Sequence, residues 1–159
     1  MAEKVGDKAR LCNAHFYMPP EVNAVDLMSD GHTDRGLLDT LLTVLPEFGV
    51  YPFEARREST GFIFNRIWAA MKRESLAVVA EGVARPEDVD GMFKVNWRVP
   101  VGPFQMMDQV GLDVVLDIEN HDAEKFPHLP KNVRDLLQDY VDAGKLGVKT
   151  GEGFYTYRT

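Results

Sequence analysis

Residues 61–81 read GFIFNRIWAAMKRESLAVVAE, which is the strongest helical pattern in the chain. Its apolar side chains recur at the spacing that lines one face of a helix: Ile63, Ile67, Ala70, Met71, Leu76, Val79 and Val83. Gly82 follows at a position where glycine commonly ends a helix. We therefore predict one long helix here, and a change in the character of the chain around residues 55–60.

The chain after this helix continues almost wholly helical. Pro86 is well placed to start the next helix, because proline fits the first helical turn. The apolar patterns and breakers predict helices over 86–97, 103–111, 112–121 and 131–144. Residues 145–157 are rich in glycine and aromatic side chains, and we expect them to be irregular.

The chain before residue 60 mixes strands with a helix. Strands are predicted at 10–17, 24–28 and 50–53, with two prolines closing the first. A leucine-rich helix lies between the second and third strands, with Thr33 as the expected N-cap and Pro46 and Gly49 ending it. Strand, strand, helix and strand make only part of an α/β layer.

The overall composition excludes several classes of function. The chain has 159 residues and a formal net charge of −7, which argues against nucleic-acid binding. Cys12 is the single cysteine, so neither an intrachain disulfide nor a multi-cysteine zinc site is possible. His32, His121 and His128 are spaced irregularly and do not predict a metal site. Without a bilayer-spanning run or a signal peptide pattern, we expect a soluble, intracellular, cytoplasmic protein with no membrane partner.

Four motifs occur in a fixed order: HFYMPP at 15–20, GFIFNRI at 61–67, VPVGPFQMMDQVGLD at 99–113 and GKLGVKTGEGFYTY at 144–157. Together they resemble the L-3-hydroxyacyl-CoA dehydrogenase family, over nearly the whole chain from about Arg10. The resemblance implies a mainly α fold, with an all-helical C-terminal domain for substrate binding and dimerisation at 58–159. It also implies that residues 1–57 are a partial α/β remnant of a Rossmann-like NAD-binding domain, with about three strands and one helix.

Within this resemblance, His15 corresponds to the catalytic base of the family. Oxidation of a secondary alcohol requires removal of a hydroxyl proton, and imidazole titrates in a suitable range. The plain alternative is an ordinary histidine at the end of a strand. The family's neighbouring glutamate corresponds to Asp26 if one residue is deleted, and to Leu27 in the ungapped alignment. We favour Asp26 as the orienting partner, although it could also be a solvent-facing strand residue.

The resemblance assigns Asn65, within GFIFNRI, to polarisation of the substrate. An uncharged donor suits a keto oxygen; a polar residue on the outer face of the helix is the alternative. Met18 stands where the family usually has asparagine, which puts the substrate preference in doubt more than the fold.

The resemblance also implies NAD as cofactor, an acyl-CoA substrate and a homodimer. The phosphate-binding fingerprint G-x-G-x-x-G does not occur in the chain, so no residue is assigned to cofactor binding and none to metal binding. We therefore expect a truncated 3-hydroxyacyl-CoA dehydrogenase. Two alternatives stay open: a non-catalytic acyl-CoA-binding or dimerisation module, including half of a split enzyme, and a related dehydrogenase acting on a free hydroxy acid.

These expectations give the first prediction. The chain on its own should neither bind NAD measurably nor turn over substrate, because it lacks the dinucleotide fingerprint. The measurement is the absorbance of NADH after addition of acetoacetyl-CoA. A clear decrease that depends on the protein would contradict the prediction.

Overall fold

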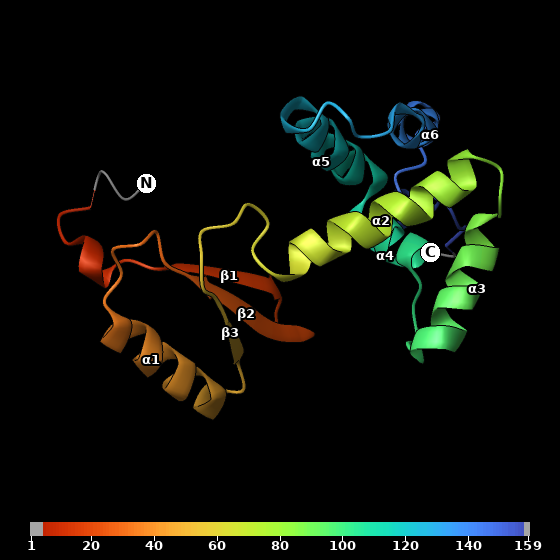
Figure 1. The fold of residues 1–159 in the computed structure, drawn as a ribbon. Coiled ribbons are helices and arrows are strands. Elements are labelled where there is room, and N and C mark those ends of the chain that lie inside the picture. The colour runs from red at the N-terminus through yellow and green to blue at the C-terminus, as the bar shows by residue number, and fades with distance from the viewer. Residues whose placement is uncertain (1–4, 158–159) are drawn as a thin grey trace. The chain divides into compact units, whose positions relative to one another are not determined.

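The computed structural model describes residues 5–157, and the chain groups into two compact units, 1–68 and 69–159. We call them the N-terminal and the C-terminal unit and describe each by itself (Figure 1). Helix α2, Phe64–Ala80, begins in the first unit and continues into the second. The functional division predicted between residues 57 and 58 stays a prediction.

The N-terminal unit is built on a three-stranded sheet in the order β1-β2-β3. The strands are β1 Asn13–Met18, β2 Val22–Met28 and β3 Tyr51–Ala55. β1 pairs with β2 antiparallel, and β2 pairs with β3 parallel. The short helix η2, Lys8–Arg10, precedes β1, so the first predicted strand starts later than residue 10.

Helix α1, Arg35–Val44, and the short helix η3, Leu45–Phe48, connect β2 to β3. Leu38 of α1 packs with Val25 and Leu27 of β2 in the core of this unit, and Figure 1 shows α1 beside the strands. Side chains alternate between the faces of a strand. Asp26, between Val25 and Leu27, therefore lies on the sheet face that α1 does not cover.

The predicted N-cap of α1 is wrong by one residue. Asp34, and not Thr33, accepts a hydrogen bond from the backbone N–H of Leu37. The Thr33 hydroxyl instead donates to the carbonyl of Leu11, at 2.5 Å. Thr33 therefore does not cap α1, because its hydroxyl bonds a carbonyl 22 positions earlier in the chain.

The C-terminal unit is helical and confirms the mainly α fold class with a small preceding sheet. After α2 come α3 Pro86–Trp97, α4 Pro103–Val110, α5 Leu112–Lys125, α6 Lys131–Asp142 and the short helix η4 Val148–Thr150. Gly82 has a φ of 72° and ends α2, as its position predicted. None of the helices within residues 5–157 is long and apolar enough to cross a membrane.

The predicted apolar face of α2 is only partly buried. Ile67 is 52% exposed and Val83, beyond the helix, is 71% exposed, whereas Leu76 is fully buried. Lys72, which the apolar pattern did not select, is 2% exposed. The spacing of apolar residues therefore identified the helix correctly but identified only part of what it buries: Leu76 and not Lys72.

Lys72 is buried because it belongs to an ionic cluster that joins α2 to α5. Its Nζ lies 2.9 Å from Oε1 of Glu119, which is also 2% exposed. Arg73 contacts the other oxygen of Glu119 at 2.7 Å and a carboxylate oxygen of Asp122 at 2.9 Å. Two cations thus share Glu119, and removal of that carboxylate would leave Lys72 buried without a counter-charge.

Asp90 of α3 anchors the start of α4. It is 1% exposed and accepts hydrogen bonds from the backbone N–H groups of Phe104 and Gln105, at 2.8 and 3.1 Å. The Tyr155 hydroxyl donates to the same carboxylate at 2.8 Å. A Cβ at Gly102 would lie only 2.4 Å from Cγ of Asp90, so this close approach requires glycine.

Asp108 of α4 anchors the C-terminal loop in the same way. It is fully buried and accepts from the backbone N–H groups of Phe154 and Tyr155, at 2.9 and 3.0 Å, and from the Tyr157 hydroxyl at 2.9 Å. Burial raises the pKa of this carboxyl, while these hydrogen-bond donors act in the opposite direction. The irregular segment predicted from its glycines is therefore held in one conformation.

The cluster around Glu119 gives the second prediction. Replacement of Glu119 by Ala should lower the free energy of unfolding by about 3–5 kcal/mol, because a buried Lys72 is left unpaired. Urea unfolding followed by circular dichroism measures the change. Glu124→Ala, on the same helix with a side chain 80% exposed, is the matched control and should change little. Equal stability of the two variants would show that the cluster contributes nothing.

Candidate functional site

His15 lies on β1 directly opposite Asp26 of β2 in the antiparallel register. Cross-strand partners project from the same face of a sheet, so both side chains lie on the face away from α1. The register thus brings Asp26 to His15, while Leu27 packs in the core on the other side. The position of Asp26 agrees with the sequence alignment that we favoured.

The His15 ring is held by aromatic contacts. It stacks on Phe62, with ring centroids 4.8 Å apart and an interplanar angle of 26°, and meets the ring of Tyr17 edge-on at 4.8 Å. Its Nδ1 is buried and has no hydrogen-bond partner among the residues that the structure describes. A buried nitrogen that lacks a partner is costly to a fold and needs an explanation.

Asp26 is 2% exposed, and its carboxylate has two donors. The Tyr17 hydroxyl makes a short hydrogen bond to Oδ2, and the backbone N–H of Ile63 donates to the same oxygen at 3.3 Å. Ile63 immediately precedes α2, so the carboxylate lies at the positive end of a helix. Both donors hold Oδ2 of Asp26 in place.

Tyr17 was not singled out in the sequence, although a signal was present. It lies two residues after His15 on the same strand, so strand alternation places both on one face. Burial raises the pKa of its hydroxyl, and the bond and charge of Asp26 raise it further; the backbone N–H of Phe64 acts the other way. Tyr17 is therefore a neutral donor to Asp26 throughout the neutral pH range.

The backbone before α2 places Phe62 over His15. Gly61 has a φ of 83° and Phe62 a φ of 54°, so both residues occupy the left-handed region. Glycine adopts it readily, but a phenylalanine there is uncommon. Held this way, Phe62 presents its ring to His15 while the next N–H, that of Ile63, reaches Asp26.

Asn65 lies in the first turn of α2 and is half-buried. It makes no side-chain hydrogen bond to His15 or Asp26 among the residues that the structure describes. The structure therefore brings His15 and Asp26 together and leaves the amide of Asn65 free of that pair. Met18, at the end of β1, is 54% exposed.

The pairing of an imidazole with a carboxylate has the chemistry of proton transfer. An imidazole opposite a buried carboxylate can accept and return a proton while the carboxylate stabilises the cation. Within residues 5–157 no group of three His, Cys, Asp or Glu side chains is arranged to hold a metal ion.

The glycines at 151–153 do not form a dinucleotide site. A Cβ at Gly153 would lie 2.1 Å from Oδ1 of Asp108, so this glycine serves the packing of the C-terminal loop. Glu152 forms isolated bridges with Gly147 and Thr156, and no strand-turn-helix unit surrounds it. The residues that the structure describes therefore do not fit NAD here, and we assign none of them to hold it.

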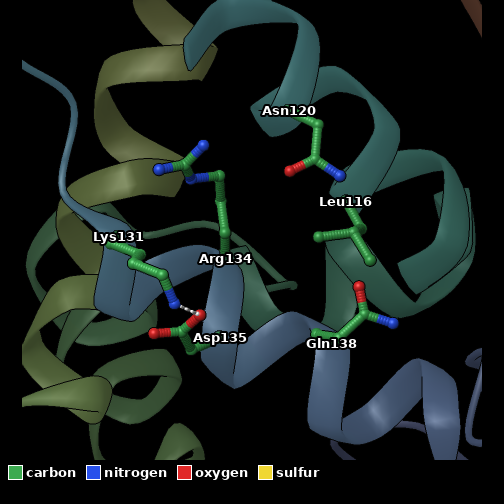
Figure 2. A pocket seen from close by; sticks show the side chains of 6 residues that line it. All are labelled: Leu116, Asn120, Lys131, Arg134, Asp135 and Gln138. Carbon is green, nitrogen blue, oxygen red and sulfur yellow. Dashed lines mark hydrogen bonds and ion pairs between the residues drawn. The ribbon is translucent and has the colours of Figure 1, made fainter. Parts of the chain in front are cut away.

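A separate polar hollow lies in the C-terminal unit between α5 and α6 (Figure 2). It has a volume of about 170 Å³ and is lined by Leu116, Asn120, Lys131, Arg134, Asp135 and Gln138. Lys131 is paired with Asp135 across one turn of α6. The hollow is lined by no histidine, serine or cysteine, and its lysine is paired with its aspartate, so we assign no role to it.

Comparison with known proteins adds to this geometry. A family model described as 3-hydroxyacyl-CoA dehydrogenase, C-terminal domain, matches residues 61–157. A 3-hydroxyacyl-CoA dehydrogenase-like protein, LAM1, of Cochliobolus heterostrophus is 43% identical over 152 residues, which cover 93% of this chain and 32% of LAM1. A 3-hydroxybutyryl-CoA dehydrogenase of Clostridioides difficile is 34% identical over 93% of this chain and 53% of its own length.

The fold is also similar to a solved structure. The crystal structure of (S)-3-hydroxybutyryl-CoA dehydrogenase PaaH1 from Ralstonia eutropha superposes with a TM-score of 0.84 at 31% identity, covering 99% of this chain and 56% of that one. The chain thus spans between a third and about half of the relatives named here. On the family model and these similarities, the chain belongs to the 3-hydroxyacyl-CoA dehydrogenase family.

Proposed function

We propose that this chain carries the acid–base part of a 3-hydroxyacyl-CoA dehydrogenase site, with His15 as general acid and base. The reaction is the oxidation of a 3-hydroxyacyl-CoA to the 3-ketoacyl-CoA. In that reaction the hydroxyl proton would pass to His15 as the C3–O bond becomes a carbonyl. NAD, held outside the residues described, would supply the hydride acceptor, and the residues of this chain would supply the proton chemistry.

The observation that carries this proposal is the pairing of His15 with Asp26 on one sheet face. Because Nδ1 of His15 is buried, Nε2 is the nitrogen left to take the substrate proton. The imidazolium formed in this step lies opposite Asp26, whose negative charge stabilises it. The stacked ring of Phe62 restricts the imidazole to one orientation, which keeps Nε2 in place.

Asn65 is proposed as the substrate-polarising residue. Its amide has no hydrogen bond to the other site residues that the structure describes, so it is available to donate to the oxygen on C3. An uncharged donor stabilises the developing oxygen charge without changing its own protonation state.

We propose a homodimer as the assembly, with the second copy on α3. This helix leaves large apolar side chains in solvent: Met92 is 67%, Val95 78% and Trp97 60% exposed. Beside them lies an apolar groove of about 430 Å³ that also includes Val78, Val89 and Phe93. Apolar surface of this kind marks interaction sites. It also keeps open the alternative that the chain is a non-catalytic dimerisation module.

The third prediction separates these functions. When the chain is mixed with a separate NAD-binding Rossmann domain of the family, acetoacetyl-CoA should be reduced at the expense of NADH. His15→Gln should lower the rate by about 10²–10⁴-fold, the usual contribution of a general acid or base. His32→Gln is the control, because the His32 side chain is 60% exposed on the same unit.

Full activity of His15→Gln would exclude the proposed role. If no combination with a Rossmann domain is active and only self-association is seen, the chain is a dimerisation module.

The fourth prediction concerns the dimer. The chain should sediment as a dimer, and Met92→Glu should make it monomeric because a charge is placed on the proposed interface. Ile118→Glu is the matched control, since Ile118 is an apolar side chain on α5 that is 43% exposed. It should remain dimeric. A monomeric wild-type chain, or a dimeric Met92→Glu variant, would contradict the proposal.

A further inference from the structure

Tyr17 touches both members of the proposed proton-transfer pair. Its hydroxyl donates to Oδ2 of Asp26, and its ring edge meets the ring of His15 with centroids 4.8 Å apart. The backbone N–H of Ile63 donates to the same Oδ2. Both of these donors to the Asp26 carboxylate are thus groups other than His15.

These contacts reduce the capacity of the Asp26 carboxylate to accept a further hydrogen bond. A carboxylate that already accepts two hydrogen bonds is a weaker acceptor for a third donor, because its charge is partly compensated. His15 is the cross-strand partner of Asp26, and its Nδ1 is buried without a partner among the residues that the structure describes. If Nδ1–H bound Asp26, it would be a third donor and would compete with Tyr17 for that carboxylate.

Two other tyrosines in the chain bond buried aspartates without this competition. Tyr155 donates to Asp90 and Tyr157 donates to Asp108. The described contacts place no histidine at either carboxylate, and the remaining donors there are backbone N–H groups. These two bonds join segments of the C-terminal unit. The bond of Tyr17 differs because its acceptor lies opposite a histidine.

We infer that Tyr17 is a positioning residue for His15: its hydroxyl holds Oδ2 of Asp26 and thereby limits how strongly Asp26 binds Nδ1–H. The functional meaning rests on the proposed role of His15. An imidazole bound too firmly to a carboxylate is a cation that returns its proton reluctantly, whereas one without a carboxylate is a weak base. Tyr17 keeps the interaction between Asp26 and the His15 ring at a strength between these two extremes.

The groups around His15 differ in whether they can titrate. Tyr17 on its own strand and Asp26 on β2 are titratable. The segment before α2 contributes the ring of Phe62, which is not titratable, and β3 contributes Phe53 as the cross-strand neighbour of Asp26. A change in the behaviour of the His15 ring can therefore be traced to Tyr17 and Asp26.

The fifth prediction tests the inference by nuclear magnetic resonance of the His15 ring in the full chain, without substrate. In Tyr17→Phe, the Nδ1 proton should move downfield and exchange more slowly, because Asp26 becomes free to accept it. The ring signals should also titrate at higher pH. Tyr157→Phe removes an equivalent bond to Asp108 and should leave the His15 signals at their wild-type positions.

Two further measurements keep the inference falsifiable. In an Asp26→Asn background, Tyr17→Phe should have no effect on His15. If Tyr17→Phe does not fold, 3-fluorotyrosine at position 17 gives the opposite test. Its more acidic hydroxyl is a stronger donor to Asp26, so the His15 ring should titrate at lower pH.

Unchanged His15 signals in Tyr17→Phe or with fluorotyrosine would overturn the inference, as would an effect of Tyr17→Phe that persists in the Asp26→Asn background. These readouts need neither substrate nor NAD. Failure of the inference is therefore distinct from failure of the proposed function, which the turnover of His15→Gln tests.

Discussion

A buried aspartate that accepts one tyrosine hydroxyl and at least one backbone N–H is the interaction on which both units depend. It occurs at Asp26, at Asp90 and at Asp108. In each case the N–H groups come from a segment far along the chain: Ile63, the start of α4, and the C-terminal loop. A buried carboxylate is unfavourable unless its oxygens are hydrogen-bonded. Each aspartate therefore helps to fix the path of the segment that donates to it.

At Asp26 this structural device also forms a site. The strand register places an imidazole opposite the carboxylate, which neither Asp90 nor Asp108 has in the described contacts. The hydrogen bonds that hold Oδ2 of Asp26 also place the carboxylate where it faces the strand of His15. The contact between β2 and the segment before α2, and the proposed acid–base chemistry, thus depend on the same carboxylate, so a substitution of Asp26 would affect both.

The sequence predicted the elements well and their long-range contacts poorly. The helix at 86–97 follows from local patterns, which the structure confirms. Helix α1 ends at Val44, and the predicted breakers Pro46 and Gly49 lie in the short helix η3 and at its C-cap. Asp26 could be placed opposite His15 only by choosing between two alignments, since a shift of one residue moves a strand side chain to the other face. Tyr17 and Ile63 were missed because their roles depend on partners nine and 37 positions away. The donors to Asp108 lie 46 and 47 positions away in the C-terminal loop, a contact that no local pattern predicts.

The apolar residues of α2 also show what a local sequence pattern cannot predict. Periodicity identifies a face without saying what covers it, and Ile67 remains 52% exposed on that face. At the start of the helix, Gly61 and Phe62 follow a left-handed path that no periodic pattern encodes. Backbone in this region is costly for a phenylalanine and persists where its surroundings require it. Here the requirement is visible: the same turn places the Phe62 ring on His15 and the next N–H on Asp26.

Because the family match begins at Gly61, the proposed site combines two strands that precede the match with the first residues inside it. The first turn of the matched domain is therefore part of the proposed site as well as the start of a helix.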